Sequence, residues 1–193
     1  MPTYEFHHIF PLTGVQKSRL ARLITDWHAT TFKAPRFIVN CRFVDIRASN
    51  PEDFWVGGRQ LKTNRLMITL RSGTGRTAEQ YADITTKLVS FWNDSIQEVQ
   101  AGPKEKELKD VFIMGSYDSA FERGFFLPMV SCFQGLFLSV YTDATFFQPG
   151  KFEEWVAGNE AEFRELASGG DEIFQDLVEE LETRPEFKFA NKG

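Results

Sequence analysis

The first ten residues, MPTYEFHHIF (1–10), predict a β-strand from Tyr4 to Phe10. Aromatic and β-branched side chains favour an extended backbone, and the proline that follows stops the strand. A helix is expected next, because TGVQ from Thr13 fits a capping box and apolar residues then recur at helical spacing to about Phe32. A second strand over 37–46 would complete a β-α-β unit.

The same pattern repeats after residue 64. The sequence predicts a strand over 66–70, a second capping box (TAEQ from Thr77) with a helix behind it, and a closing strand over 111–114. The two boxes are 77 − 13 = 64 residues apart, and that offset places Leu20 on Ile84 in the two apolar stripes. We therefore expect a duplicated β-α-β unit in an α/β (α+β) fold.

The chain beyond the second unit is less regular. Two amphipathic helices are expected to flank the core, ending at Gly169-Gly170 and before Pro185. Their outward faces carry acidic residues, which predicts a solvated acidic surface: Glu153, Glu154, Glu160, Glu162, Glu165, Glu179, Glu180 and Glu182. The expected single domain (1–193) comprises a first unit (1–48), a second unit (64–116), an inserted apolar, β-leaning segment (125–147) and C-terminal helices (150–183).

The composition is that of a globular protein with many phenylalanines. Of 193 residues, 42% are hydrophobic and 20 are Phe, and the balance of basic and acidic residues is 22 − 27 = −5. The acidic balance and the lack of a basic run argue against a nucleic-acid partner. Cys41 and Cys132 are too few for a disulfide framework and have no metal-ligand spacing, so we expect a reducing compartment and no metal site.

The sequence shows no export or membrane pattern. Its start lacks a positively charged region followed by an apolar one, so no signal peptide is expected and the chain is expected to be cytoplasmic. Pro128, Gln134 and Asp143 interrupt the most apolar segment, which argues against a membrane span. Neither a dinucleotide nor a Walker glycine pattern is present, so no cofactor is expected.

Pro2 is the first candidate catalytic residue. Aminopeptidases remove an initiator Met before a small residue, so the mature chain could begin with the secondary amine of Pro2. An α-amino group titrates near pH ~8, and burial lowers the pKa of a cation, so this amine could act as a base near neutrality. The alternative is that Met-Pro is simply a common start of a chain, and a retained Met1 would leave Pro2 as an amide.

Two other places could bind an anion. Arg71 and Arg76 flank a glycine-containing turn before the second helix, where guanidinium groups and helix N–H groups favour a carboxylate. The alternative is an ordinary turn with solvated arginines. His28 lies at the margin of the first helix's apolar stripe, where it could face a cleft or could be a satisfied histidine without a role.

Glu122 is a candidate acid or base because it lies between aromatic residues. An apolar setting would raise the pKa of its carboxyl group into a useful range. Tyr117 is near it in the sequence and could donate a hydrogen bond. The alternatives are a Glu122–Arg123 ion pair or a loop carboxylate in water, and a tyrosine that only packs.

Taken together, these pieces resemble the tautomerase superfamily, the group of 4-oxalocrotonate tautomerase, and within it proteins similar to cis-3-chloroacrylic acid dehalogenase. The resemblance covers residues 1 to about 165. The motifs that carry it are, in order, MPxY (1–4), ITDWH (24–28), FWVGG (54–58), GRTA (75–78), FERGFFLP (121–128) and QPG (148–150) before EEW (153–155). It implies two fused β-α-β units per chain, assembled as a homotrimer, with the amino-terminal proline at the floor of each site.

The resemblance also implies roles for single residues. Pro2 would be the catalytic amine, His28 and Arg76 would hold a substrate carboxylate, and Glu122 would activate water. The family's second arginine and its tyrosine are displaced: Gly73 occupies the arginine position, with Arg71 two residues earlier. Ile113 likewise takes the tyrosine position, and Tyr117 could substitute for it from the next turn.

These departures favour one reaction over the other. Dehalogenation needs both arginines, the tyrosine and the acid at fixed geometry, and errors of ~1 Å are costly. We therefore expect proline-dependent tautomerisation of a small unsaturated or 2-oxo carboxylate first, and hydratase or dehalogenase activity on 3-haloacrylates second. The alternative is a non-catalytic trimeric domain that keeps the fold and binds a ligand or a protein.

Overall fold

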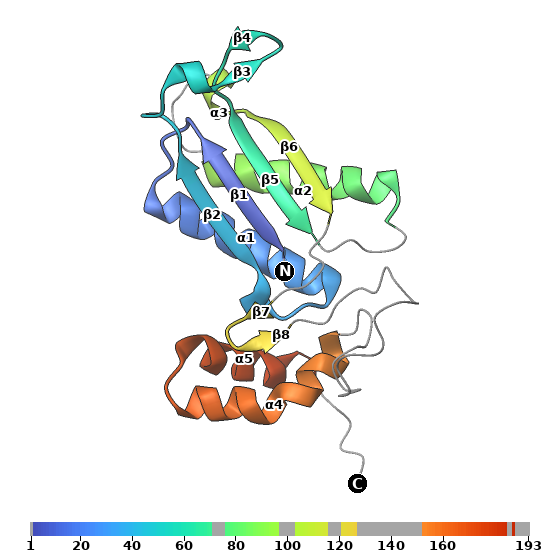
Figure 1. Cartoon of the computed structure of the whole chain (residues 1–193). Helices are drawn as coiled ribbons and strands as arrows, with labels where there is room; N and C mark the ends of the chain where they lie inside the picture. Colours follow the sequence, from blue (N-terminus) through green and yellow to red (C-terminus); the bar gives the residue numbers. More distant parts are fainter. Residues whose placement is uncertain are drawn as a thin grey trace, which may run out of the picture.

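A four-stranded mixed sheet forms the centre of the fold (Figure 1). The computed structural model describes residues 2–70, 76–96, 103–115, 121–126, 152–184 and 187. The strand order is β2-β1-β5-β6. The strands are β1 (Thr3–His8), β2 (Asn40–Asp45), β5 (Asn64–Leu70) and β6 (Leu108–Gly115).

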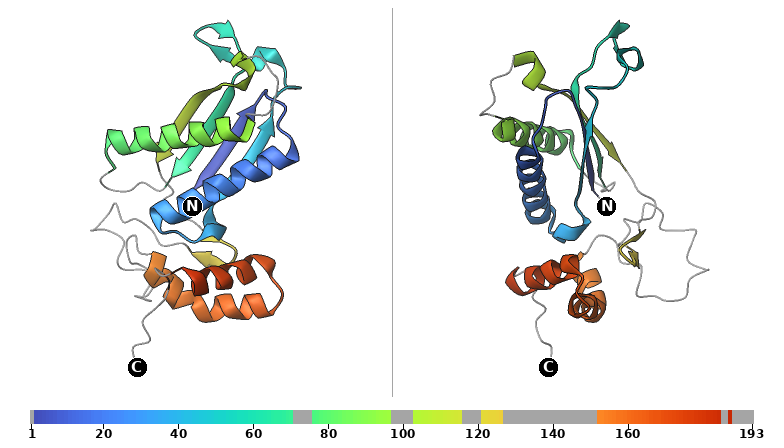
Figure 2. Two further views of the ribbon diagram at one scale, coloured as in Figure 1. Left: turned by 180° about the vertical axis from the view of Figure 1, so that it is seen from behind. Right: turned by 90° about the vertical axis from the view of Figure 1, so that its left-hand side faces the viewer.

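The sheet is built from two β-α-β units, as the sequence predicts. β1 pairs in parallel with β2, β5 pairs in parallel with β6, and β1 and β5 are antiparallel. Helices α1 (Gly14–Phe32) and α2 (Ala78–Ile96) cover one face of the sheet (Figure 2). Tyr4 pairs with Ile68, which is also its equivalent at the 64-residue offset, so a pseudo-twofold axis passes between these two residues.

Both predicted capping boxes are present. The Thr13 hydroxyl accepts the Gln16 N–H at 3.2 Å, and the Gln16 side chain accepts the Thr13 N–H at 2.8 Å. Thr77 and Gln80 repeat this exchange at 3.2 and 2.9 Å. Each box satisfies two helix-start N–H groups that have no intrahelical partner, which is why both helices begin where the sequence predicts.

The main core lies between the sheet and the two helices. Alternate residues of β1 and β5 point into it, including Phe6 and Leu66, which are fully buried. Leu20 and its equivalent Ile84 are both buried, in line with the duplication. Trp92, also fully buried, stacks on Phe6 with ring centroids 5.8 Å apart. Large aromatic side chains thus supply much of the buried apolar area of this core.

A second, smaller core holds the C-terminal helices α4 (Phe152–Ser168) and α5 (Glu172–Thr183). The hairpin of β7 (Phe121–Glu122) and β8 (Phe125–Phe126) inserts Phe125 between them. The centroid of its ring lies 4.8 Å from that of Phe163 and 5.7 Å from that of Phe174. Phe37, in the segment that follows α1, stacks on Trp155 of α4. The helices therefore pack on both the hairpin and the segment after α1, and they lie beyond one end of the sheet (Figure 1).

The structure corrects the expected strand over 37–46. Residues Arg36–Ile38 form a short 3₁₀ helix, η1, and β2 begins at Asn40. This turn lets Ile38 pack under Ala34 while Phe37 enters the second core. Tertiary packing has therefore overridden the β propensity of these residues.

Three short elements were not expected. One is a hairpin of β3 (Trp55–Val56) and β4 (Arg59–Gln60), whose two-residue turn needs positive φ at Gly57 (56°) and Gly58 (76°). The others are η2 (Pro51–Asp53) and α3 (Pro103–Lys106).

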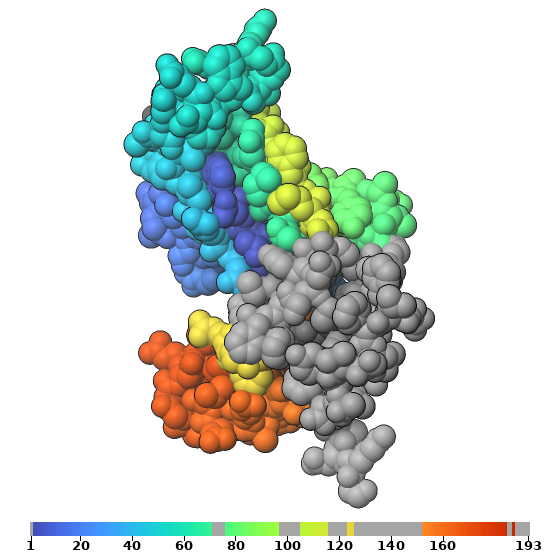
Figure 3. All heavy atoms as spheres, viewed as in Figure 1, coloured from blue at the N-terminus to red at the C-terminus, as the bar shows by residue number. Residues whose placement is uncertain are grey.

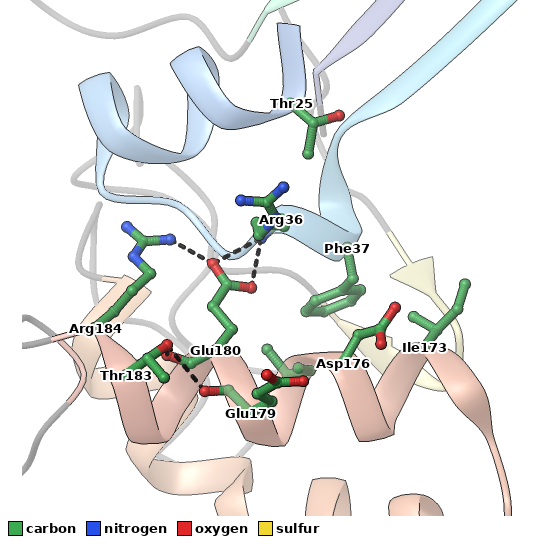
Figure 4. A pocket seen from close by; sticks show the side chains of 10 residues that line it. Thr25, Arg36, Phe37, Ile173, Asp176, Glu179, Glu180, Thr183 and Arg184 are labelled. Carbon is green, nitrogen blue, oxygen red and sulfur yellow. Dashed lines mark hydrogen bonds and ion pairs between the residues drawn. The ribbon is translucent and has the colours of Figure 1, made fainter. Parts of the chain in front are cut away.

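The expectation of a solvated acidic surface is wrong for Glu180. Glu180 is only 7% exposed, because it lies one helical turn after the buried Leu177 on the same face of α5. Its carboxylate accepts the Arg36 backbone N–H and pairs with Arg184 at the edge of a cleft of about 540 Å³ (Figure 4). Of the other seven, Glu153 and Glu160 are half-buried and the remaining five are exposed.

Most of the inserted segment 125–147 lies outside the described residues, apart from Phe125 and Phe126. Among the helices that the structure describes, none is long and apolar enough to cross a membrane.

Candidate functional site

Pro2 lies at the start of β1, at the end of the sheet nearest the C-terminal helices (Figure 1). It is buried, and its carbonyl accepts the Asn40 N–H at 3.1 Å, which anchors this end of β1 to β2. Side chains alternate along a strand, and burial alternates with them from Pro2 to His8. Pro2 and Tyr4 therefore share the face that the helices cover.

Tyr4 and His28 form a buried hydrogen bond at this end of the core. The Tyr4 hydroxyl oxygen lies 2.7 Å from Nδ1 of His28, and the two residues are 0% and 6% exposed. Their rings meet edge to face, with centroids 5.9 Å apart. Helix α1 thus places His28 over the strand that follows Pro2.

Arg76 approaches the same place from the second unit. It lies just before the Thr77 capping box, and its guanidinium lies over the Phe32 ring, 5.2 Å from the centroid. The Phe32 ring is in turn 4.5 Å from the His28 ring. A half-exposed guanidinium beside a helix start and a histidine is an arrangement that can hold a carboxylate.

Both members of the Tyr4–His28 pair are held neutral. Burial, followed by the positive charge of Arg76, lowers the pKa of His28 to about 3. Burial, followed by the nearby Cys41 thiol, raises the pKa of Tyr4 far above its ordinary value. Near neutral pH the hydrogen bond therefore joins a phenol to an uncharged imidazole.

The structure brings together three of the six predicted site residues, Pro2, His28 and Arg76. Arg71 and Tyr117 lie outside the described residues. Glu122 lies on β7, directly opposite Phe125, rather than in a loop. That hairpin sits between the end of the sheet nearest Pro2 and the C-terminal helices (Figure 2).

Sequence reasoning missed Tyr4 and Phe32 as parts of the site. Tyr4 could have been found from its position two residues after Pro2 on one face of a strand. Phe32 could have been found from its position one helical turn after His28. Among the described residues, no group of three His, Cys, Asp or Glu is placed to hold a metal ion.

The neutral histidines predict a loss of stability in acid. His28 and His8 are both buried, and burial lowers the pKa of each. Because an unfolded histidine titrates near pH ~6.5, the unfolded chain binds more protons, and stability falls as pH drops from about 6.5 toward 3.

For His28 alone the expected loss is about 2 kcal/mol between pH 7.5 and pH 5, a range above most carboxylate titration. Urea unfolding at these two pH values measures it, and His28→Gln should show a smaller difference than the parent chain. Equal or higher stability of the parent at pH 5 would contradict this account.

The duplicated β-α-β frame with a proline-led first strand defines a tautomerase-like α/β protein. A family model described as "Putative oxalocrotonate tautomerase enzyme" matches residues 1–136. The chain belongs to this family, which confirms the expected superfamily. A search among curated proteins gave no match.

Several solved structures are similar to this chain. One is N1, a member of the cis-3-chloroacrylic acid dehalogenase family: identity 22%, coverage 86% of this chain and 99% of that one, TM-score 0.52. Native RhCC from Rhodococcus jostii RHA1 is 21% identical over 66% of this chain and 86% of its own, with a TM-score of 0.50. A probable enzyme from the thermophilic fungus Aspergillus fumigatus is 22% identical over 69% of this chain and 88% of its own, with a TM-score of 0.50. These likenesses support the fold.

Proposed function

We propose that the chain is a tautomerase that uses the amino-terminal amine of Pro2 to move a proton on a small unsaturated or 2-oxo carboxylate. The observation that carries the proposal is the convergence of Pro2, neutral His28 and Arg76 at one end of the sheet. Membership of the tautomerase family supports it. We further propose that the protein works in the cytoplasm, a reducing compartment that suits a chain with two cysteines, too few for a disulfide framework.

The proposed reaction converts an enol into a ketone. The neutral Pro2 nitrogen takes the enol hydroxyl proton, the carbonyl forms, and the resulting prolinium returns a proton to the carbon two bonds from the oxygen. No atom is gained or lost. Arg76 and the Nε2–H of His28 hold the substrate carboxylate, so the reacting carbon lies over Pro2.

A second activity, hydration of an acetylenic or 3-haloacrylic acid, depends on Glu122. In this step Glu122 takes a proton from water, the water oxygen bonds to the substrate, and the protonated form of Pro2 supplies a proton to the neighbouring carbon. The proton on Glu122 then returns to Pro2 through solvent. The strand position of Glu122 near the same end of the sheet is compatible with that role.

The test is ketonisation of phenylenolpyruvate by the purified protein, alongside hydration of an acetylenic and a chloroacrylic acid. Arg76→Ala should raise KM about tenfold or more, because a charged hydrogen bond to a carboxylate contributes roughly 1.5–3 kcal/mol. Arg59→Ala, in the exposed β4 strand at the far end of the sheet, is the matched control. Absence of turnover on all three substrates would contradict the proposed function.

We also propose a homotrimer, from the sheet face that α1 and α2 leave uncovered. Phe112 and Met114 of β6 are 46% and 42% exposed there, and the Arg65 guanidinium lies over the Phe112 ring at 5.5 Å. Figure 3 shows this face, with the β6 side chains at its surface. Sedimentation equilibrium should give three times the 22.2 kDa chain mass. A single-chain mass would contradict the trimer.

A further inference from the structure

The Tyr4–His28 hydrogen bond has two possible proton arrangements. Either the Tyr4 hydroxyl donates to an unprotonated Nδ1, or a protonated Nδ1 donates to the Tyr4 oxygen. The two arrangements put opposite chemistry on the other ring nitrogen. In the first, Nε2 carries a hydrogen and can donate a hydrogen bond to an anion. In the second, Nε2 carries a lone pair that repels an anion.

Burial of Tyr4 decides between them. Tyr4 is fully buried, and within the described residues its hydroxyl has one hydrogen-bond partner, Nδ1 of His28. If Nδ1 were the donor, the hydroxyl hydrogen would be left in the core without an acceptor. A buried donor without a partner is costly, so the arrangement with Tyr4 as donor is favoured.

The opposite nitrogen of His28 is not engaged by any residue that the structure describes. Among the residues that the structure describes, Nε2 of His28 has no hydrogen-bond partner, and it is not one of the fully buried polar atoms left unpaired. The contrast is with Nε2 of His8, which is both unpaired and buried. The positive charge of Arg76 lies over the Phe32 ring, which in turn contacts the His28 ring.

We propose that Tyr4 is a positioning residue that holds His28 as its neutral Nε2–H tautomer, so that Nε2–H and Arg76 together bind the substrate carboxylate. The functional half of this inference rests on the proposed tautomerase activity. The tautomer itself does not, because it follows from the buried contact alone. A neutral histidine gives direction to the carboxylate, while Arg76 supplies the charge.

The first experiment is ¹⁵N-detected NMR of the histidine side chains in the ligand-free protein at pH 7.5, with His28 assigned by His28→Gln. The expected His28 spectrum has a protonated Nε2 and an unprotonated Nδ1 shifted by an accepted hydrogen bond. In Tyr4→Phe that shift should disappear and the pKa of His28 should rise. A protonated Nδ1 in the parent protein would overturn the proposal whether or not the protein is active.

The second experiment is steady-state kinetics of Tyr4→Phe on phenylenolpyruvate. Binding of the carboxylate should weaken, so KM is expected to rise about tenfold while kcat changes less than about threefold. Tyr81→Phe, at a half-buried residue of α2, is the control for the general loss of a tyrosine hydroxyl. An unchanged KM would overturn the substrate-binding role. An inactive parent with the expected spectrum would contradict the proposed function and leave the tautomer assignment standing.

Discussion

Replacing Pro2 with alanine should remove most of the turnover while leaving the fold intact. The alanine amine is primary and more free to rotate, so it loses the fixed direction that the proline ring gives to the nitrogen lone pair. General acid–base catalysis by a positioned group contributes about 10²–10⁴-fold, and kcat should fall by that order with a smaller change in KM. Alanine is also small enough for removal of the initiator Met, so we expect the parent and the variant to begin at the same residue.

Steady-state ketonisation of phenylenolpyruvate measures this loss. Pro11→Ala, at an exposed site beyond β1, is the matched control and should retain the parent rate. A kcat for Pro2→Ala within about threefold of the parent would contradict proline catalysis. A parent protein without turnover, together with a Pro2→Ala variant of unchanged ligand affinity, would favour the non-catalytic binding domain instead.

Removing Arg184 should give the largest loss of stability, because it joins the C-terminal helices to α1. Its guanidinium donates to the carbonyls of Ala29 and Ala34, each at 3.0 Å, at the carboxyl end of α1, where the helix dipole favours a cation. It also pairs with the buried Glu180. Burial raises the pKa of Glu180, and its hydrogen bonds to Arg36 and Arg184 lower this pKa by a smaller amount.

Arg184→Ala leaves the Glu180 carboxylate buried without its cation, and breaking a buried pair in this way costs about 3–5 kcal/mol. Urea unfolding, followed by tryptophan fluorescence, measures the change. The double variant Glu180→Leu/Arg184→Met should recover part of the loss, since replacing both charges removes the desolvation cost.

The exposed pair of Arg164 and Glu182 on α4 and α5 supplies the control for Arg184. Arg164→Ala should cost no more than about 1 kcal/mol, because water screens this pair. Equal effects of Arg184→Ala and Arg164→Ala would show that the buried network does not join the two parts of the chain.

Local sequence signals were sufficient for most of the frame. The capping boxes at Thr13 and Thr77 and the apolar stripes behind them act within a few residues, so both long helices and the duplication follow from spacing alone. The strand predicted over 37–46 failed at its start, because Phe37 is drawn into a core built by helices more than a hundred residues away. Propensity carries no information about such a contact.

The site was predicted less completely for a related reason. Pro2, His28 and Arg76 could be named from motifs, but the Tyr4–His28 bond joins residues 24 apart, and its distance depends on how α1 packs on β1. Glu180 was placed on the surface because it stands among other acidic residues. Its spacing of three from Leu177 was the signal that it borders the buried stripe of α5.

Proline catalysis is best tested by the intact mass of the purified protein before and after reaction with 3-bromopropiolate, a label directed at an amino-terminal proline. We expect a mass that lacks Met1 and one adduct that maps to Pro2, because a free secondary amine in an anion-binding site should react with a small electrophilic carboxylate. Retained Met1, or a proline-terminated chain that takes no adduct, would contradict it and would leave Pro2, His28 and Arg76 as a binding site without a catalytic amine.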